Sequence, residues 1–114
     1  MAIKDSTASL SLDGKVALIT GGGTGIGKSI ALEFARAGAS IAISGRRPGP
    51  LEEVTQQIKS MGREAIAVPT DVSKKSEVDV LVETVNQEIG KIDILVNNAA
   101  NGGSGPSLLD SDEQ

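Results

Sequence analysis

A glycine-rich segment near the start of the chain has residue types suited to binding phosphate. Thr20–Gly27 reads TGGGTGIG and follows a short apolar run. Glycines permit a tight turn and a close backbone approach, and free amides at the start of a following helix attract a pyrophosphate. The G-x-x-x-G-x-G spacing differs from the usual G-x-G-x-x-G of dinucleotide sites, but the physical requirements are shared. We therefore predict cofactor binding by Gly21, Thr24, Gly25, Ile26 and Gly27.

The same segment also matches a competing motif. Gly22–Ser29 fits the P-loop pattern G-x-x-x-x-G-K-S, in which Lys28 would reach the β- and γ-phosphates and Ser29 would bind magnesium. A P-loop protein also needs an Asp at the carboxyl end of a neighbouring apolar strand. Asp93 stands at the wrong end of its expected strand, and Asp71 follows a run that a proline interrupts. The P-loop is therefore kept as an alternative, beside a glycine turn that binds nothing.

Two arginines follow the second apolar run, about 20 residues beyond the glycine segment, where a dinucleotide site recognises the adenosine ribose. An NAD-specific site would carry Asp or Glu there, whereas this chain reads Gly45-Arg46-Arg47. Guanidinium groups pair well with a 2′-phosphate, so Arg46 and Arg47 favour NADP(H) over NAD(H). The alternative is that both are ordinary solvated loop charges.

Two further segments follow apolar runs. The Asp71 carboxylate could accept a hydrogen bond from an adenine amino group and the Val72 amide could donate to the ring, although Asp71 could equally cap a helix ahead of Ser73. Asn97–Ala100 reads NNAA, whose small residues would let the backbone lie close to a cofactor while the Asn amides tie adjacent strands together. The alternative for this segment is an ordinary Asn-rich turn. We predict cofactor contacts at Asp71, Val72, Asn97, Ala99 and Ala100.

These segments need strands and helices to bring them together, and the apolar spacing predicts both. Short apolar runs predict strands at Val16–Ile19, Ser40–Ser44, Ala65–Val68 and Ile92–Val96. Apolar residues at helical spacing predict three helices, one from Ile26 to Gly38, one from Pro50 to Gly62, and one capped by Ser73 and ended by Gly90. The order βαβαβαβ with right-handed crossovers predicts an α/β fold with a doubly wound parallel sheet of Rossmann type, strand order 3-2-1-4. All the candidate segments then fall at carboxyl ends of strands, where such sheets bind ligands.

Length and composition allow one domain and exclude several classes of function. The 114 residues carry a net charge of −4 and a single aromatic residue, Phe34, which argues against nucleic-acid binding. Without His or Cys the chain cannot form His-based nucleophilic triads or thiolate and histidine metal sites, and we expect no metal. No apolar run suggests a membrane span or a signal peptide, so we expect a cytoplasmic protein with no membrane partner.

Residues 1–13 are predicted as a loose polar arm, 14–100 as the dinucleotide-binding unit, and 101–114 as a polar loop and the start of an incomplete helix.

Taken together, these residues resemble the short-chain dehydrogenase/reductase family. The first strand with TGGGTGIG, the Asp71-Val72 pair and the segment Ile92–Ala99 match family motifs, and the resemblance covers Leu12–Ala100. The family usually has N-N-A-G where this chain has Ala100, and N-N-A-A is similar to dienoyl- and enoyl-CoA reductase branches. The resemblance implies an NADP(H)-binding portion of an oxidoreductase that transfers hydride between nicotinamide and a carbonyl, alcohol or enoyl-type substrate.

The resemblance also implies what this chain lacks. The family's chemistry uses a Tyr, a Lys, a Ser and a helix-borne Asn, and these would all lie beyond Gln114, since the chain has no Tyr. We expect no catalytic residue here, an inactive chain, and a fold truncated to the amino-terminal half of a longer parent that forms homo-oligomers. A non-catalytic dinucleotide-binding module is the second hypothesis.

Overall fold

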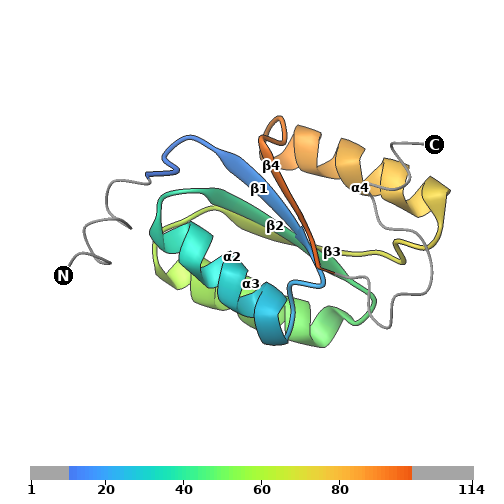
Figure 1. Cartoon of the computed structure of the whole chain (residues 1–114), viewed down its shortest axis with the longest axis horizontal. Coiled ribbons are helices and arrows are strands. Elements are labelled where there is room, and N and C mark those ends of the chain that lie inside the picture. The colour runs from blue at the N-terminus through green and yellow to red at the C-terminus, as the bar shows by residue number, and fades with distance from the viewer. Residues whose placement is uncertain (1–10, 99–114) are drawn as a thin grey trace.

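The computed structural model describes residues 11–98, which form a parallel sheet covered by helices on both faces (Figure 1). Residues 1–10 of the predicted arm, Ala99, Ala100 and residues 101–114 lie outside the described part. The elements run in the order β1 (Val16–Thr20), α2 (Gly25–Arg36), β2 (Ser40–Gly45), α3 (Pro48–Ser60), β3 (Ala65–Pro69), α4 (Lys75–Glu88) and β4 (Ile94–Asn97).

The sheet has the predicted strand order, β3-β2-β1-β4, and all three pairings are parallel. Thr20, at the end of β1, is in register with Ser44 of β2 and Asn97 of β4. Gly45 of β2 is in register with Pro69 of β3. The carboxyl ends of the four strands therefore meet at one edge of the sheet, as the sequence predicts.

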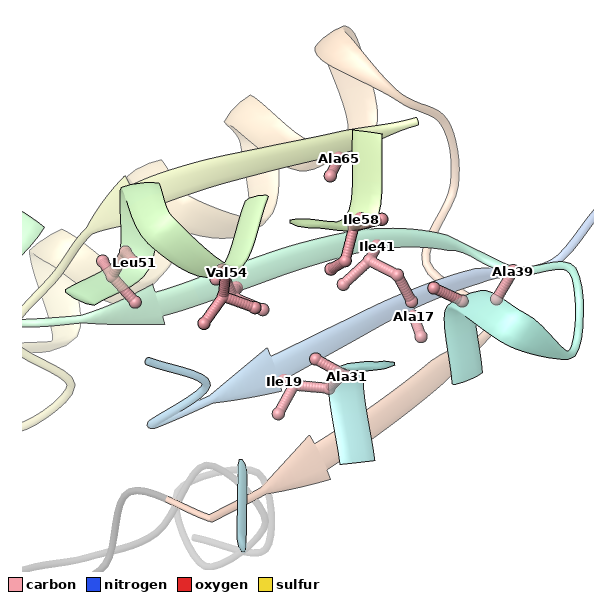
Figure 2. Close-up of a cluster of buried hydrophobic side chains, with 11 residues drawn as sticks. Ala17, Ile19, Ala31, Ala39, Ile41, Leu51, Val54, Ile58 and Ala65 are labelled. Atoms are coloured by element: carbon pink, nitrogen blue, oxygen red, sulfur yellow. The ribbon is translucent and has the colours of Figure 1, made fainter. Parts of the chain in front are cut away.

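Helices cover the two faces unequally. Figure 1 shows α2 and α3 together on one face and α4 alone on the other. The larger core lies under α2 and α3, where Ile19 and Ile41 of the central strands pack with Val54 and Ile58 of α3 (Figure 2). A smaller cluster on the other face joins Leu18 to Leu81 and Val85 of α4. Both central strands are buried nearly throughout, which explains their continuous apolar sequence.

Several predicted boundaries are wrong by one or two residues, and each of the four strands ends one residue later than predicted. Helix α3 begins at Pro48 rather than Pro50, with a proline in the first turn, where a missing N–H costs nothing. The N-cap of α4 is Lys74, not Ser73. Strand β4 begins at Ile94 rather than Ile92, because Asp93 uses its carboxylate to accept the Val16 N–H at 2.9 Å.

The first apolar residue of α2 is not part of the core. The helical spacing that predicts this helix groups Ile26 with Ile30 and Phe34 on one apolar face, but Ile26 is 70% exposed. It lies in the first turn of α2, directly after the glycine loop, whereas the buried residues of this helix are Gly27, Ala31 and Ala35. Its exposure leaves an apolar side chain next to the glycine loop.

Candidate cofactor-binding site

The glycine loop between β1 and α2 is shaped by two residues in the left-handed region. Gly21 has φ of 69° and Gly25 has φ of 57°, conformations that side chains other than glycine rarely adopt. The N–H groups of Gly21 and Gly22 both donate to the Ser44 carbonyl, at 2.7 and 3.3 Å. The loop is thus held against the end of β2, and a Cβ on Gly25 would point into open space.

Gly27 allows α2 to approach the loop closely. A Cβ at this position would collide with the carbonyl oxygen of Gly21 and lie 2.7 Å from Asn98 Nδ2. Gly22 is similarly confined, since its Cβ would lie 2.6 Å from the Ile43 side chain. These contacts show why glycine at position 27 lets α2 pack closely against the loop.

The N-terminus of α2 presents backbone amides that have no partner within the helix itself. The first bond within the helix runs from Lys28 N to the Thr24 carbonyl at 3.2 Å, so the amides of Gly25, Ile26 and Gly27 come before it. The Thr24 side chain makes no capping hydrogen bond. These groups, together with the positive end of the helix dipole, fit a pyrophosphate.

The same geometry argues against the P-loop alternative. A P-loop wraps a phosphate with the residues between its two outer glycines, yet here the helix has already begun at Gly25. The strands beside β1 end in Gly45 and Asn97, and neither is the Asp that would hold magnesium. Residues 11–98 contain no group of three or more acidic side chains placed to bind a metal ion.

Polar side chains join the end of β4 to β1 and the glycine loop, and we call the hydrogen bonds from Thr20 and Gly21 to Asn97 and Asn98 the latch. The Thr20 hydroxyl accepts the Asn98 N–H at 2.9 Å and lies 3.2 Å from Asn97 Oδ1. The Asn98 side-chain amide donates to the Gly21 carbonyl at 3.3 Å. The prediction that Asn amides tie adjacent strands is confirmed for Asn97, whose Oδ1 accepts the Thr20 hydroxyl of β1, while the Asn98 side chain joins the end of β4 to the glycine loop. Ala99 and Ala100, the other predicted contacts of this segment, lie outside the described residues.

The ends of β2 and β3 carry the predicted adenosine contacts. Arg46 and Arg47 are exposed immediately after β2, and Thr70 N, beside Asp71, donates to the Gly45 carbonyl at 2.7 Å. The two chain segments are therefore adjacent. Hydrogen bonds from Ser73 lower the pKa of Asp71, with a smaller contribution from the positive charge of Arg46. Asp71 is an ionised acceptor at neutral pH, and Arg46 lies within its electrostatic range.

Asp71 also has the local structural role that the sequence left open. Its Oδ1 accepts both the Ser73 N–H at 3.0 Å and the Ser73 hydroxyl at 2.7 Å. It organises the turn before α4 without capping the helix, because the N-cap residue is Lys74. This role uses Oδ1, and within residues 11–98 no hydrogen bond engages Oδ2.

Sequence reasoning missed three residues that shape the site. The Thr20 hydroxyl accepts the Asn98 N–H and donates to the Asn97 side-chain oxygen. The Ser44 carbonyl accepts the N–H groups of Gly21 and Gly22, and Glu77 accepts the Asp71 N–H at 2.8 Å. Thr20 is the last residue of β1 and Ser44 is the residue before the last one of β2. Both are polar residues in apolar strands and both are fully buried, so their residue types at these positions are the available sequence signal. No sequence signal identified Glu77.

Comparison with known proteins assigns the fold to a family. Residues 15–114 match the family model described as short chain dehydrogenase. The chain belongs to the short-chain dehydrogenase/reductase family. Its described residues include the glycine loop and the strand order of the cofactor-binding part of that family, and none of their helices is long and apolar enough to cross a membrane.

Individual relatives show how much of a family member this short-chain dehydrogenase sequence spans. It is 45% identical to 7alpha-hydroxysteroid dehydrogenase of Escherichia coli (strain K12), covering 89% of this chain and 39% of that protein. It is 49% identical to a peroxisomal 2,4-dienoyl-CoA reductase of Arabidopsis thaliana, covering 76% and 29%. A homolog from Bacillus subtilis, YusS, is 44% identical, and there the match covers 75% of this chain and 80% of the relative.

A solved structure gives the same result. L-Sorbose reductase from Gluconobacter frateurii, complexed with NADPH and L-sorbose, superposes with a TM-score of 0.78 at 39% identity, covering 89% of this chain and 38% of that one. The chain thus matches only the amino-terminal part of the longer members of its family.

Proposed function

We propose that this chain is the NADP(H)-binding portion of a short-chain oxidoreductase. The observation that carries the proposal is that the carboxyl ends of four parallel strands meet at one edge of the sheet. The start of α2, which has no side-chain cap, follows β1 at this edge, with Asn98 at the end of β4 and the exposed Arg46 at the end of β2. The amides of Gly25–Gly27 would bind the pyrophosphate, with Gly21 and Thr24 forming the turn. The exposed apolar side chain of Ile26 would contact the bound cofactor.

The preference for NADP(H) over NAD(H) rests on charge. The two exposed arginines after β2 present guanidinium groups where an NAD-specific site would present a carboxylate. A ribose 2′-phosphate would pair with them in the bidentate geometry that arginine favours. The NADPH complex of L-sorbose reductase, a structural relative, supports this assignment.

The adenine ring would be recognised by Asp71 Oδ2 and the Val72 amide, and the segment Asn97–Ala100 would lie along the cofactor. A bound nicotinamide donates or accepts a hydride. We propose a carbonyl, alcohol or enoyl-type partner for that hydride, because relatives include a hydroxysteroid dehydrogenase and a dienoyl-CoA reductase. The N-N-A-A sequence is the feature of this chain that favours the acyl thioester class.

A binding module without turnover is the second candidate. The 114 residues include no tyrosine, so the acid/base group that the family resemblance implies is not among them. The match to YusS, of which the chain covers 80%, shows that a relative of similar extent exists. On this proposal the chain binds NADPH and does not oxidise it.

The test is cofactor binding by the whole chain and by Arg46→Asp, measured by calorimetry with NADPH and NADH. A charge-assisted bond from arginine to phosphate contributes about 1.5–3 kcal/mol, so NADPH affinity should fall about 10- to 100-fold. NADH affinity should stay within about twofold, since NADH has no 2′-phosphate.

The matched control is Lys91→Asp, which changes the charge equally at an exposed position on the opposite edge of the sheet. It should leave both affinities unchanged. An equal loss of NADPH and NADH binding in Arg46→Asp would show that Arg46 does not read the 2′-phosphate. Binding of Mg-ATP, with no binding of either dinucleotide, would favour the P-loop alternative over the proposed function.

A further inference from the structure

The turn between β3 and α4 holds Asp71 by nearly all of its polar atoms. The Asp71 carbonyl accepts the Lys74 N–H at 3.0 Å, and Oδ1 accepts the backbone and side-chain donors of Ser73. The remaining backbone group, the Asp71 N–H, donates to Glu77 Oε1 at 2.8 Å. The residue is therefore fixed from the turn on one side and from the helix on the other.

The bond from Glu77 is not an ordinary helix cap. Glu77 is the third residue of α4, and a capping-box glutamate at that position would accept the N–H of the N-cap residue, which is Lys74. Here the side chain reaches three residues further back, to the residue that follows Thr70 at the edge of the sheet. It is half-buried, so the bond is partly shielded from water.

This arrangement leaves two groups of the turn for a ligand. Within residues 11–98 no hydrogen bond engages Asp71 Oδ2 or the Val72 N–H. An acceptor beside a donor complements the amino group and N1 of adenine. The peptide that carries the Val72 N–H begins at the Asp71 carbonyl, so its direction depends on how the Asp71 backbone is held.

We propose that Glu77 is a positioning residue for adenine recognition, which rests on the proposed NADP(H) binding. Its carboxylate oxygen fixes the Asp71 backbone and so aims both the Asp71 side chain and the Val72 amide at the base. Glu77 itself does not touch the cofactor. Its loss lowers the discrimination between adenine and a base with the opposite pattern of donor and acceptor.

The experiment compares NADPH with its hypoxanthine analogue, nicotinamide hypoxanthine dinucleotide phosphate, in the full chain. Hypoxanthine has an oxygen in place of the amino group and a proton on N1, so it opposes both groups of the turn. A paired set of hydrogen bonds to a base edge discriminates by about tenfold or more, which is the preference for NADPH expected of the wild type. The ratio of the two dissociation constants is the readout.

Two substitutions separate position from charge. Glu77→Asp keeps the negative charge at the start of α4 but withdraws the oxygen from the Asp71 N–H, and should bring the ratio close to one. Glu77→Gln keeps an oxygen of the same reach without the charge, and should retain the wild-type ratio. Glu83→Asp, an exposed glutamate on the same helix, is the control and should match the wild type.

Each other outcome overturns the inference in a recognisable way. An unchanged ratio in Glu77→Asp would show that Asp71 and Val72 are positioned without Glu77. Equal loss of affinity for both ligands in Glu77→Asp and Glu77→Gln would indicate a purely structural role. A wild type that binds both ligands equally would remove the adenine assignment while leaving NADPH binding intact, and a wild type that binds neither would remove the proposed function itself.

Discussion

Replacing Gly27 with alanine tests the idea that close packing of α2 on the glycine loop builds the candidate site. The added Cβ would collide with the Gly21 carbonyl oxygen and come within 2.7 Å of Asn98 Nδ2. Both are held by other elements, because Asn98 donates to the same carbonyl and Gly21 N donates to Ser44. The helix must therefore move away from the loop.

The cost can be worked out from these contacts. Overpacking costs about 2 kcal/mol, and losing the bond from Asn98 to Gly21 costs about 1 kcal/mol more. Alanine in a helix regains about 1 kcal/mol relative to glycine. We expect Gly27→Ala to lower the free energy of unfolding by about 2 kcal/mol, which is about 8–16 °C in Tm for a domain of this size.

Urea unfolding followed by circular dichroism at 222 nm is the assay, since the chain has no Trp or Tyr for fluorescence. Gly49→Ala is the matched control: it lies in α3, and its Cβ would meet nothing within 4 Å. That variant should stay within about 0.5 kcal/mol of the wild type, because the helical preference of alanine is opposed by the steric restriction that Pro50 places on the residue before it. Equal midpoints for Gly27→Ala and the wild type would refute the packing argument.

Two further predictions concern buried and ionised side chains. Thr20→Val leaves the Asn98 N–H without its acceptor and should lower the free energy of unfolding by about 1–3 kcal/mol in urea titrations. Ser44 is in register with Thr20, and its buried hydroxyl has no hydrogen bond within residues 11–98, so Ser44→Ala should be neutral or slightly stabilising. A larger loss of stability for Ser44→Ala than for Thr20→Val would contradict this reasoning. The pKa of Asp71 is lowered in the folded state, chiefly by Ser73, so its stabilisation is present above its ordinary pKa and lost as the pH falls through the lowered one. The difference in the free energy of unfolding between wild type and Asp71→Asn should therefore shrink from pH 6 to pH 3. A difference that grew on acidification would contradict a lowered pKa of Asp71 in the folded state.

The fold and the meeting of the candidate segments could be predicted because both follow from topology. Parallel strands joined by right-handed crossovers must bring their carboxyl ends to one edge, so Arg46 and Asp71 could be placed near Gly21 without knowing any contact. The same argument places the Asn97-Asn98 segment of β4 beside the end of β1, and the Asn98 side chain does bond the Gly21 carbonyl there.

What could not be predicted depends on side chains competing for the same backbone groups. Ser73 has the residue type of a helix cap, but the Asp71 carboxylate takes its hydrogen bonds and the helix starts one residue later. Ile26 fits the spacing of a buried face, yet its side chain is exposed in the first turn of α2. Propensity describes what a residue can do alone, and these positions are decided by neighbours.

The latch between Thr20 and Asn98 has a consequence for the order in which the chain assembles. Val16 and Ser40, paired between β1 and β2, are 24 residues apart, whereas the hydrogen bonds that join β1 to the β4 segment span 76 to 78 residues. Closing the longer loop costs about 1 kcal/mol more in chain entropy. Pairing of β4 offsets this cost by burying only part of the surface of its four residues. We therefore expect strand β4 to join the sheet last and to leave it first. A ligand that contacted the ends of β1 and β4 together would then stabilise the state in which β4 is paired.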